Sequence, residues 1–264
     1  MPVDAIIFDL EDAVAVDAKD DARALLATTL AAGGYGPRAQ IVRINGLDTQ
    51  WGADDLAALA AIGPEAILIP KVNAAEDVAR VATELNGIPA AKDTQIWAMM
   101  ETPQGILNAP AIASAPRMGG MVMGTNDLAK DLGTRPRADR EPMVASLGLC
   151  LLAARAAGIA IVDGVYNAFK DEDGLRAECV QGRDMGFDGK TLIHPAQVEI
   201  ANDVFAPSDA EIDLATRQIA AFDEAAAKGQ GVAVVDGRIV ENLHVETARA
   251  TLAKAQAIAE LSAL

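Results

Sequence analysis

The chain of 264 residues is long enough for one large hydrophobic core or for two smaller domains. Its formal net charge of −16 disfavours general electrostatic binding to nucleic acid or to an anionic membrane surface. No apolar run approaches the roughly 18 residues of a membrane span, and the acidic N-terminus lacks the basic segment of a secretion signal. We therefore expect a cytoplasmic protein without a nucleic-acid or membrane partner.

Apolar segments rich in strand-forming residues alternate with alanine-rich helical segments along most of the chain. The expected strands are residues 5–10, 40–45, 66–70, 95–100, 120–124, 159–164 and 187–193. The expected helices between them are Ala18–Leu30, Gly52–Ala61, Ala75–Leu85, Pro142–Ala157 and Gly174–Met185. Such alternation is typical of the α/β class, with a parallel sheet covered by helices.

Polar residues gather at or near the carboxyl ends of these expected strands. They include Asp9, Arg43, Asn45, Lys71, Glu101, Asp127, Asp163, Lys190 and His194. In a (β/α)8 TIM barrel these ends converge on the mouth that holds the active site. An open doubly wound sheet would instead use a glycine-rich phosphate loop, and no G-x-G-x-x-G follows the first strand. The pattern favours the barrel, although only seven strands can be counted.

The pattern changes after residue 207, so we expect a barrel domain over residues 1–207 and a small lid over residues 208–264. The lid begins with a polar helix, Asp209–Ala227. Two short β-like runs, VAVV and RIV, then flank Asp236-Gly237, which is a strong hairpin signal. A final alanine-rich helix over Val245–Ala259 follows the hairpin.

Glu101 and Asp127 end successive expected strands, so their carboxylates should lie close together in a barrel. Two such carboxylates repel unless one is protonated or a cation lies between them. Both supply oxygen ligands, and no Cys or His is near either in sequence, which favours Mg²⁺, or Mn²⁺, over zinc. The alternative is that they are two unrelated surface carboxylates.

Arg43 lies in the segment IVRIN, at the end of an apolar strand, where a buried guanidinium needs an anion. Its planar fork suits a substrate carboxylate. The alternative is an internal ion pair with Glu11 or Asp12. These two acids could orient water beside a metal, or one of the acids here could cap the next helix. For His194, which precedes a proline, a hydrogen-bonded structural role is favoured over a catalytic one.

Seven short motifs carry a family likeness over nearly the whole chain. In order they are FDLEDAV, VRIN, ILIPKV, METPQG, MGTNDLAKDLG, IVDGVYNAF and GFDGKTLIHPAQ. In this order they resemble the citrate lyase beta-subunit and HpcH/HpaI aldolase family of CoA-ester lyases. That family includes malyl-CoA lyases, citramalyl-CoA lyases and malyl-CoA thioesterases.

The resemblance implies a (β/α)8 barrel that binds Mg²⁺ through Glu101 and Asp127, with Glu101 next to the substrate. It implies that Arg43 holds a carboxylate or carbonyl oxygen of the substrate. It also implies a homotrimer or hexamer, in which the C-terminal lid of one subunit closes over the site of its neighbour. The partners expected from it are an acyl-CoA and a small keto acid.

Two features depart from the family pattern. Members of the family carry an earlier strand with an Arg-Ser pair and a Pro-Gly turn, so we expect either that this sequence starts late or that the barrel closes abnormally and loses contacts to CoA. Lyases of the family also carry a lid aspartate after the hairpin, whereas this chain has Glu241 in the stretch RIVENLH. We expect Glu241 to serve as the catalytic acid or base, or to mark a change of reaction.

The resemblance predicts a Mg²⁺-dependent lyase that makes or breaks the carbon–carbon bond of malyl-, methylmalyl- or citramalyl-CoA. An alternative is a (3S)-malyl-CoA thioesterase that uses the same metal site. Further alternatives are a citrate lyase beta subunit and a catalytically silent assembly subunit.

Overall fold

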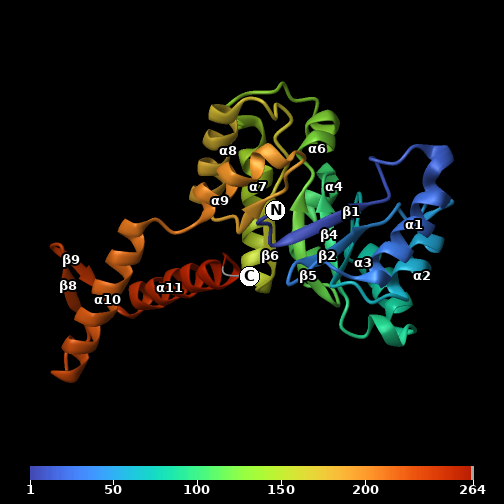
Figure 1. The fold of residues 1–264 in the computed structure, drawn as a ribbon. Coiled ribbons are helices and arrows are strands. Elements are labelled where there is room, and N and C mark those ends of the chain that lie inside the picture. Colours follow the sequence, from blue (N-terminus) through green and yellow to red (C-terminus); the bar gives the residue numbers. More distant parts are fainter. Residues whose placement is uncertain (263–264) are drawn as a thin grey trace. The chain divides into compact units, whose positions relative to one another are not determined.

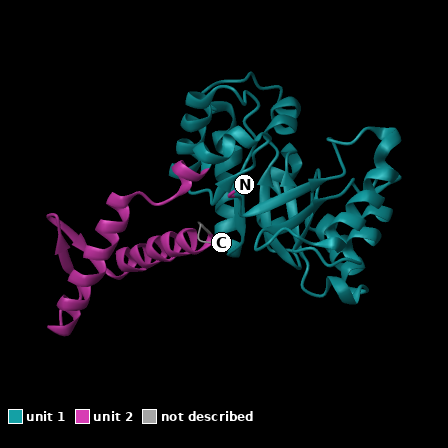
Figure 2. Ribbon diagram, viewed as in Figure 1, with its two compact units in different colours: residues 1, 3–201 teal, residues 2, 202–264 magenta. Residues whose placement is uncertain are grey.

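The structure is a computed structural model that describes residues 1–262 of the chain. It divides into two compact units. The first contains Met1 and Val3–Ala201, and the second contains Pro2 and the chain from Asn202 onward (Figure 2). Each unit has its own hydrophobic core.

The first unit is built on a parallel sheet whose strands follow one another in chain order. Its strands are β1 (Ala5–Asp9), β2 (Ala39–Arg43), β3 (Ala66–Ile69), β4 (Gln95–Met100), β5 (Met118–Met123), β6 (Ala160–Asp163) and β7 (Gly189–Lys190). The α/β class, the parallel sheet and the count of seven strands are thereby confirmed. Among the described residues, β1 and β7 are not paired with each other. The sheet is therefore a curled, open part of a barrel, and closure into eight strands is not observed.

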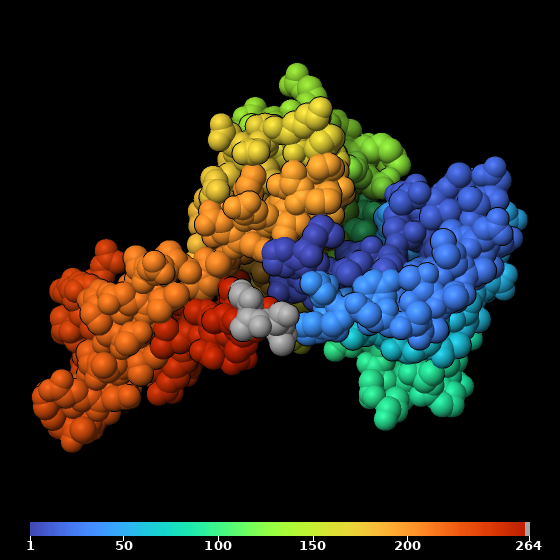
Figure 3. Space-filling model, viewed as in Figure 1, coloured from blue at the N-terminus to red at the C-terminus, as the bar shows by residue number. Residues whose placement is uncertain are grey.

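Helices follow the strands, as Figure 1 shows. They are α1 (Lys19–Ala32), α2 (Gly52–Ala60), α3 (Ala75–Asn86), α4 (Pro103–Leu107), α5 (Ala109–Ala113), α6 (Thr125–Leu132), α7 (Glu141–Ala157) and α8 (Glu172–Met185), with α9 (Val198–Phe205) running across the division between the units. Short 3-10 turns are η1 (Val16–Ala18), η2 (Pro89–Ala91) and η3 (Pro195–Gln197). Helices α1, α2 and α3 contact one another in turn, and their side chains form the continuous blue-to-cyan surface of Figure 3.

The last strand is shorter than predicted. The sequence predicts a strand over residues 187–193, whereas β7 spans only Gly189–Lys190. The side chain of Asp188 accepts the backbone N–H of Ile161, where a strand residue would offer a carbonyl. A hydrogen bond to a side chain therefore replaces one of the backbone hydrogen bonds that would extend β7 at this edge of the sheet.

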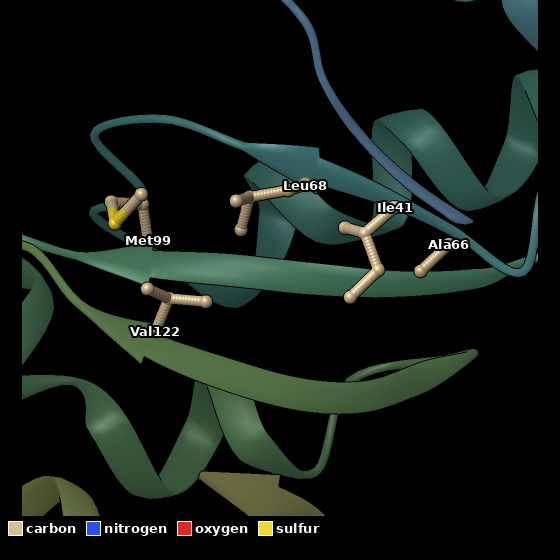
Figure 4. Packing of buried hydrophobic residues seen from close by; sticks show 5 residues of the cluster. All are labelled: Ile41, Ala66, Leu68, Met99 and Val122. Carbon is tan, nitrogen blue, oxygen red and sulfur yellow. The ribbon is translucent and has the colours of Figure 1, made fainter. Parts of the chain in front are cut away.

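Buried apolar side chains from four neighbouring strands meet on one face of the sheet. They are Ile41 on β2, Ala66 and Leu68 on β3, Met99 on β4 and Val122 on β5, drawn in Figure 4. The register pairs Ile41 with Ala66 and Met99 with Val122, so these side chains share a face because strand side chains alternate. Continuing this alternation toward the carboxyl ends places Arg43 and Glu101 on the same face. The apolar cluster therefore supports the polar residues beyond it.

The second unit contains α10 (Asp209–Ala227), an antiparallel hairpin of β8 (Ala233–Val235) and β9 (Arg238–Val240), and α11 (Asn242–Ser262). The predicted hairpin is confirmed, and Asp236 and Gly237 have φ of 50° and 74°, as a two-residue primed turn requires. Helix α11 begins earlier than the predicted Val245. Within residues 1–262, no helix is long and apolar enough to cross a membrane.

We expect Leu68→Ala to destabilise the first unit by about 2–5 kcal/mol, because Leu68 is fully buried in the apolar cluster. Urea unfolding followed by circular dichroism measures this change. Leu25→Ala, at a leucine that is 69% exposed on α1, is the matched control and should change stability by less than about 0.5 kcal/mol. Equal losses in the two variants would contradict the packing described.

Candidate active site

Arg43 makes ion pairs with acids that follow β1. Its Nε and Nη2 donate hydrogen bonds to the two carboxylate oxygens of Asp9, at 2.7 and 2.5 Å. Its Nη1 lies 2.9 Å from Oε2 of Glu11 and 3.6 Å from Asp12. The internal ion pair that the sequence left as an alternative is therefore present, and Asp9 is its main partner.

Asp9 is the residue that sequence reasoning undervalued. The sequence indicates Asp9 as one of the strand-end acids, whereas the partners it suggests for Arg43 are Glu11 and Asp12. The register places Asp9 directly opposite Arg43 on neighbouring strands. Aligning the two predicted strands would place an acid and an arginine opposite each other on one face, and this alignment could have identified the pair.

Lys71 connects this group to Glu101. Its Nζ donates to Oε1 of Glu11 at 2.6 Å, while its backbone N–H donates to Oε1 of Glu101 at 2.7 Å. The backbone of Lys71 has a φ of 50°, which is uncommon for a residue other than glycine. An alternating series of charges thus runs from Asp9 through Arg43, Glu11 and Lys71 to Glu101.

Glu101 directly follows β4 and is only 2% exposed. Burial is the main cause that raises the pKa of its carboxyl to about 7, the nearby carboxylates of Glu11 and Asp127 contribute in the same direction, and Lys71 opposes them. The side chain is therefore held where a negative charge is costly. Asp127 is near enough to disfavour the charge of Glu101, and their pairing at a metal stays a prediction.

Asp127 does not end a strand, contrary to the prediction. Strand β5 ends at Met123, and Asp127 lies in the first turn of α6. An acidic side chain is stabilised there by the helix dipole. Its Oδ1 lies 3.3 Å from Nζ of Lys130, one turn along the helix. The aspartate therefore lies at a helix N-terminus rather than at the end of a strand.

The donor set fits Mg²⁺. The charge of Asp127 disfavours the charge of Glu101, and a divalent cation held by both carboxylates would remove that repulsion. Within the described residues there is no group of three or more His, Cys, Asp or Glu side chains that could hold a metal. Mg²⁺ is commonly bound by one or two carboxylates and completed by water and substrate oxygens, whereas structural zinc needs more protein ligands.

A second charged group lies at the ends of β6 and β7. Asp163 is fully buried, accepts two hydrogen bonds from Nη1 of Arg140 at 2.8 Å, and lies 3.3 Å from Nζ of Lys190. Lys190 also donates to Glu178 at 2.6 Å. The sequence predicts Asp163 and Lys190 as strand-end residues, and the structure pairs them with each other and with Arg140 and Glu178.

His194 has the structural role that its sequence context favours. Its Nδ1 accepts the backbone N–H of Ala196, and its ring stacks on Phe169 with centroids 4.5 Å apart. Glu241 lies in the second unit, directly after β9, with an exposed side chain. Its backbone N–H donates to Nδ1 of His244 at 3.0 Å, which helps to start α11 ahead of Val245. Its catalytic role stays a prediction.

We expect Glu101 to destabilise the metal-free fold as the pH rises. The pKa of about 7 exceeds the ordinary 4.5, so between these values the folded state binds more protons than the unfolded state. The contribution of this group to the free energy of unfolding is fully present below the ordinary pKa. It is lost as the pH rises through the pKa of the folded state. At about 1.4 kcal/mol per pKa unit, the loss is on the order of 3 kcal/mol.

Urea unfolding in EDTA at about pH 5 and about pH 8 measures this effect, with Glu101→Gln as the control that cannot titrate. The wild-type protein should lose stability relative to the variant as the pH rises. Parallel pH dependence in the two proteins would show that the carboxyl of Glu101 has an ordinary pKa.

Comparison with known proteins places this arrangement in a family. Residues 1–195 match HpcH/HpaI aldolase/citrate lyase. A (3S)-malyl-CoA thioesterase from Cereibacter sphaeroides is 68% identical over 263 residues, which cover 100% of this chain and 90% of that protein. Citrate lyase subunit beta from Escherichia coli is 35% identical over 261 residues, covering 97% of this chain and 86% of that protein.

Solved structures agree with the fold. The CitE protein from Mycobacterium tuberculosis, in complex with magnesium, acetoacetate and coenzyme A, is similar with a TM-score of 0.80 and 31% identity. The similarity covers 97% of this chain and 91% of that chain. A citrate lyase from Burkholderia xenovorans, with a TM-score of 0.84 and 21% identity, supports the fold alone. The chain therefore belongs to the HpcH/HpaI aldolase/citrate lyase family.

Proposed function

We propose that this protein is a Mg²⁺-dependent (3S)-malyl-CoA thioesterase. The observation that carries the proposal is the 68% identity, over the whole of this chain, with a protein of that activity. The thioesterase was the alternative expectation from the sequence, and this relative favours it over the lyase. The carboxylate pair of Glu101 and Asp127 supports a metal-dependent reaction in the same site.

Glu101 and Asp127 would hold the Mg²⁺, and the magnesium complex of the Mycobacterium relative supports this cofactor. When bound, the cation supplies positive charge that polarises a substrate oxygen and balances the charge that develops in the transition state. The residues of this chain would determine where the cation is held. The N–H of Lys71 fixes one oxygen of Glu101, and the first turn of α6 presents Asp127.

Arg43 is the proposed ligand of the malyl carboxylate or carbonyl oxygen. Two of its nitrogens are hydrogen-bonded to Asp9. Its Nη1 forms only ion pairs, and Oε2 of Glu11 has no hydrogen-bond partner within the described residues. Nη1 is therefore the nitrogen through which Arg43 would reach the substrate while Asp9 keeps the guanidinium in place. Glu11 and Asp12 would then be free to orient water.

Hydrolysis requires water to add its oxygen to the thioester carbonyl carbon. The carbon–sulfur bond then breaks, malate forms, and the thiolate of coenzyme A takes up a proton. A base must accept a proton from the attacking water. Glu241 is the proposed base, and its position after β9 is the one where the resemblance implies a lid aspartate.

The proposal also includes the expected assembly. We propose a homotrimer or hexamer, a lid that closes over a neighbouring subunit and a closed eight-stranded barrel.

Lyase activity is the second candidate. Members of the family at 35% identity include citrate lyase subunit beta, and carbon–carbon cleavage needs the same carboxylate pair. Cleavage would break the bond between C2 and C3 of the acyl group and release a keto acid with an acyl-CoA. The product therefore distinguishes the two reactions.

We expect purified protein incubated with (3S)-malyl-CoA and Mg²⁺ to release free thiol without glyoxylate. A thiol reagent and a glyoxylate assay run in parallel measure both products, and EDTA serves as the control that removes the metal. Glyoxylate without thiol would contradict the thioesterase and establish the lyase. Thiol release that is unchanged by EDTA would contradict the metal-dependent mechanism. Methylmalyl- and citramalyl-CoA, assayed in the same way, define the acyl preference.

We expect Asp127→Asn to weaken Mg²⁺ binding by at least about tenfold, because an uncharged amide is a poor replacement for a carboxylate ligand. Isothermal titration calorimetry with MgCl₂ measures the affinity, and circular dichroism checks the fold. Asp131→Asn is the matched control on the same helix, since Asp131 lies 3.4 Å from the same Lys130. Equal weakening in both variants would point to general surface charge rather than to a ligand.

A further inference from the structure

The backbone at Lys71 has an unusual conformation for its residue type. Its φ of 50° lies in the left-handed region, which side chains with a Cβ rarely adopt. Such strain persists only where surrounding contacts hold it, and it is concentrated at functional sites. At this residue the backbone N–H donates a 2.7 Å hydrogen bond to Oε1 of Glu101.

The two oxygens of Glu101 have different surroundings. Oε1 accepts the N–H of Lys71. Oε2 lies against Gly124, where an added Cβ would overlap both this oxygen and the Cβ of Glu101. The N–H of Gly124 in turn donates to the carbonyl of Met100, at the end of β4, at 3.1 Å. The absence of a side chain at residue 124 is therefore what gives Oε2 its space.

We infer that Lys71 and Gly124 are positioning residues for Glu101, and that Glu101 presents Oε2 to the metal while the left-handed Lys71 backbone retains Oε1. This inference rests on the proposed function, because it takes Glu101 as a ligand of Mg²⁺. The backbone of Lys71 carries this role, since the N–H makes the contact with Glu101. The ammonium group has another partner, Oε1 of Glu11.

The role of the backbone can be separated from the role of the charge by two variants that both remove the ammonium group. Asparagine adopts left-handed φ more readily than other residues, whereas β-branched valine resists it. Lys71→Asn should therefore keep the N–H directed at Glu101, and Lys71→Val should turn it away. The comparison between the two variants is matched for charge.

Calorimetric titration with Mg²⁺ at a temperature where both variants are folded tests the inference. We expect the Kd for Mg²⁺ to be roughly tenfold weaker in Lys71→Val than in Lys71→Asn, as expected from the loss of one hydrogen bond to a charged group. A merely structural role would lower the unfolding temperature of the valine variant without changing the Kd of its folded form. Equal Kd values in the two folded variants would overturn the inference.

A second pair of variants at residue 71 and a variant at Gly124 provide independent tests. If Lys71→Val does not fold, Lys71→Ala and Lys71→Gly form a milder pair with the same expected order, because glycine accepts left-handed φ without strain. Gly124→Ala should also weaken Mg²⁺ binding, since its Cβ displaces Oε2, and unchanged binding there would contradict the assignment of that oxygen. Wild-type protein that binds no Mg²⁺ would overturn the proposed metal site itself, which distinguishes the two failures.

Discussion

A buried carboxylate beside other carboxylates is the constraint on which the site depends. Glu101 is almost fully buried, and Glu11 and Asp127 both disfavour its charge. Without a compensating cation, such a group is costly to the fold and tends to bind a proton. The arrangement is therefore suited to a divalent cation. A bound cation would offset the free-energy cost of the buried charge, and this relief would contribute to the affinity for the metal.

The charges around Glu101 are ordered rather than diffuse. Arg43 lies between Asp9 and Glu11, and Lys71 lies between Glu11 and Glu101, so each cation contacts acids from a different strand end. These contacts tie together the carboxyl ends of β1, β2, β3 and β4. A substrate carboxylate that binds Arg43 would enter this series in competition with Glu11. If Arg43 holds the substrate as proposed, substrate binding and the position of the neighbouring acids would be coupled.

Hydrolysis and carbon–carbon cleavage place similar demands on the first unit. Both need a polarised substrate oxygen and a group that holds the acyl carboxylate, and the residues that we assign to these tasks lie in the first unit. The two reactions differ in where a proton is removed and in whether water reaches the thioester carbon. Such differences are controlled by the acid or base and by the access of water. Glu241, the residue that we propose as the base, directly precedes α11 in the second unit.

The sequence by itself determined the order of the seven sheet strands and the Asp236-Gly237 hairpin, because continuous apolar runs and turn residues are local signals. Only the tertiary structure decided that Asp9 is the main partner of Arg43, that Asp127 reaches the site from α6 and that Gly124 leaves space for Glu101. It also decided the left-handed backbone of Lys71 and the open edges of the sheet. These features depend on contacts between segments far apart in the chain, and local sequence carries no record of them.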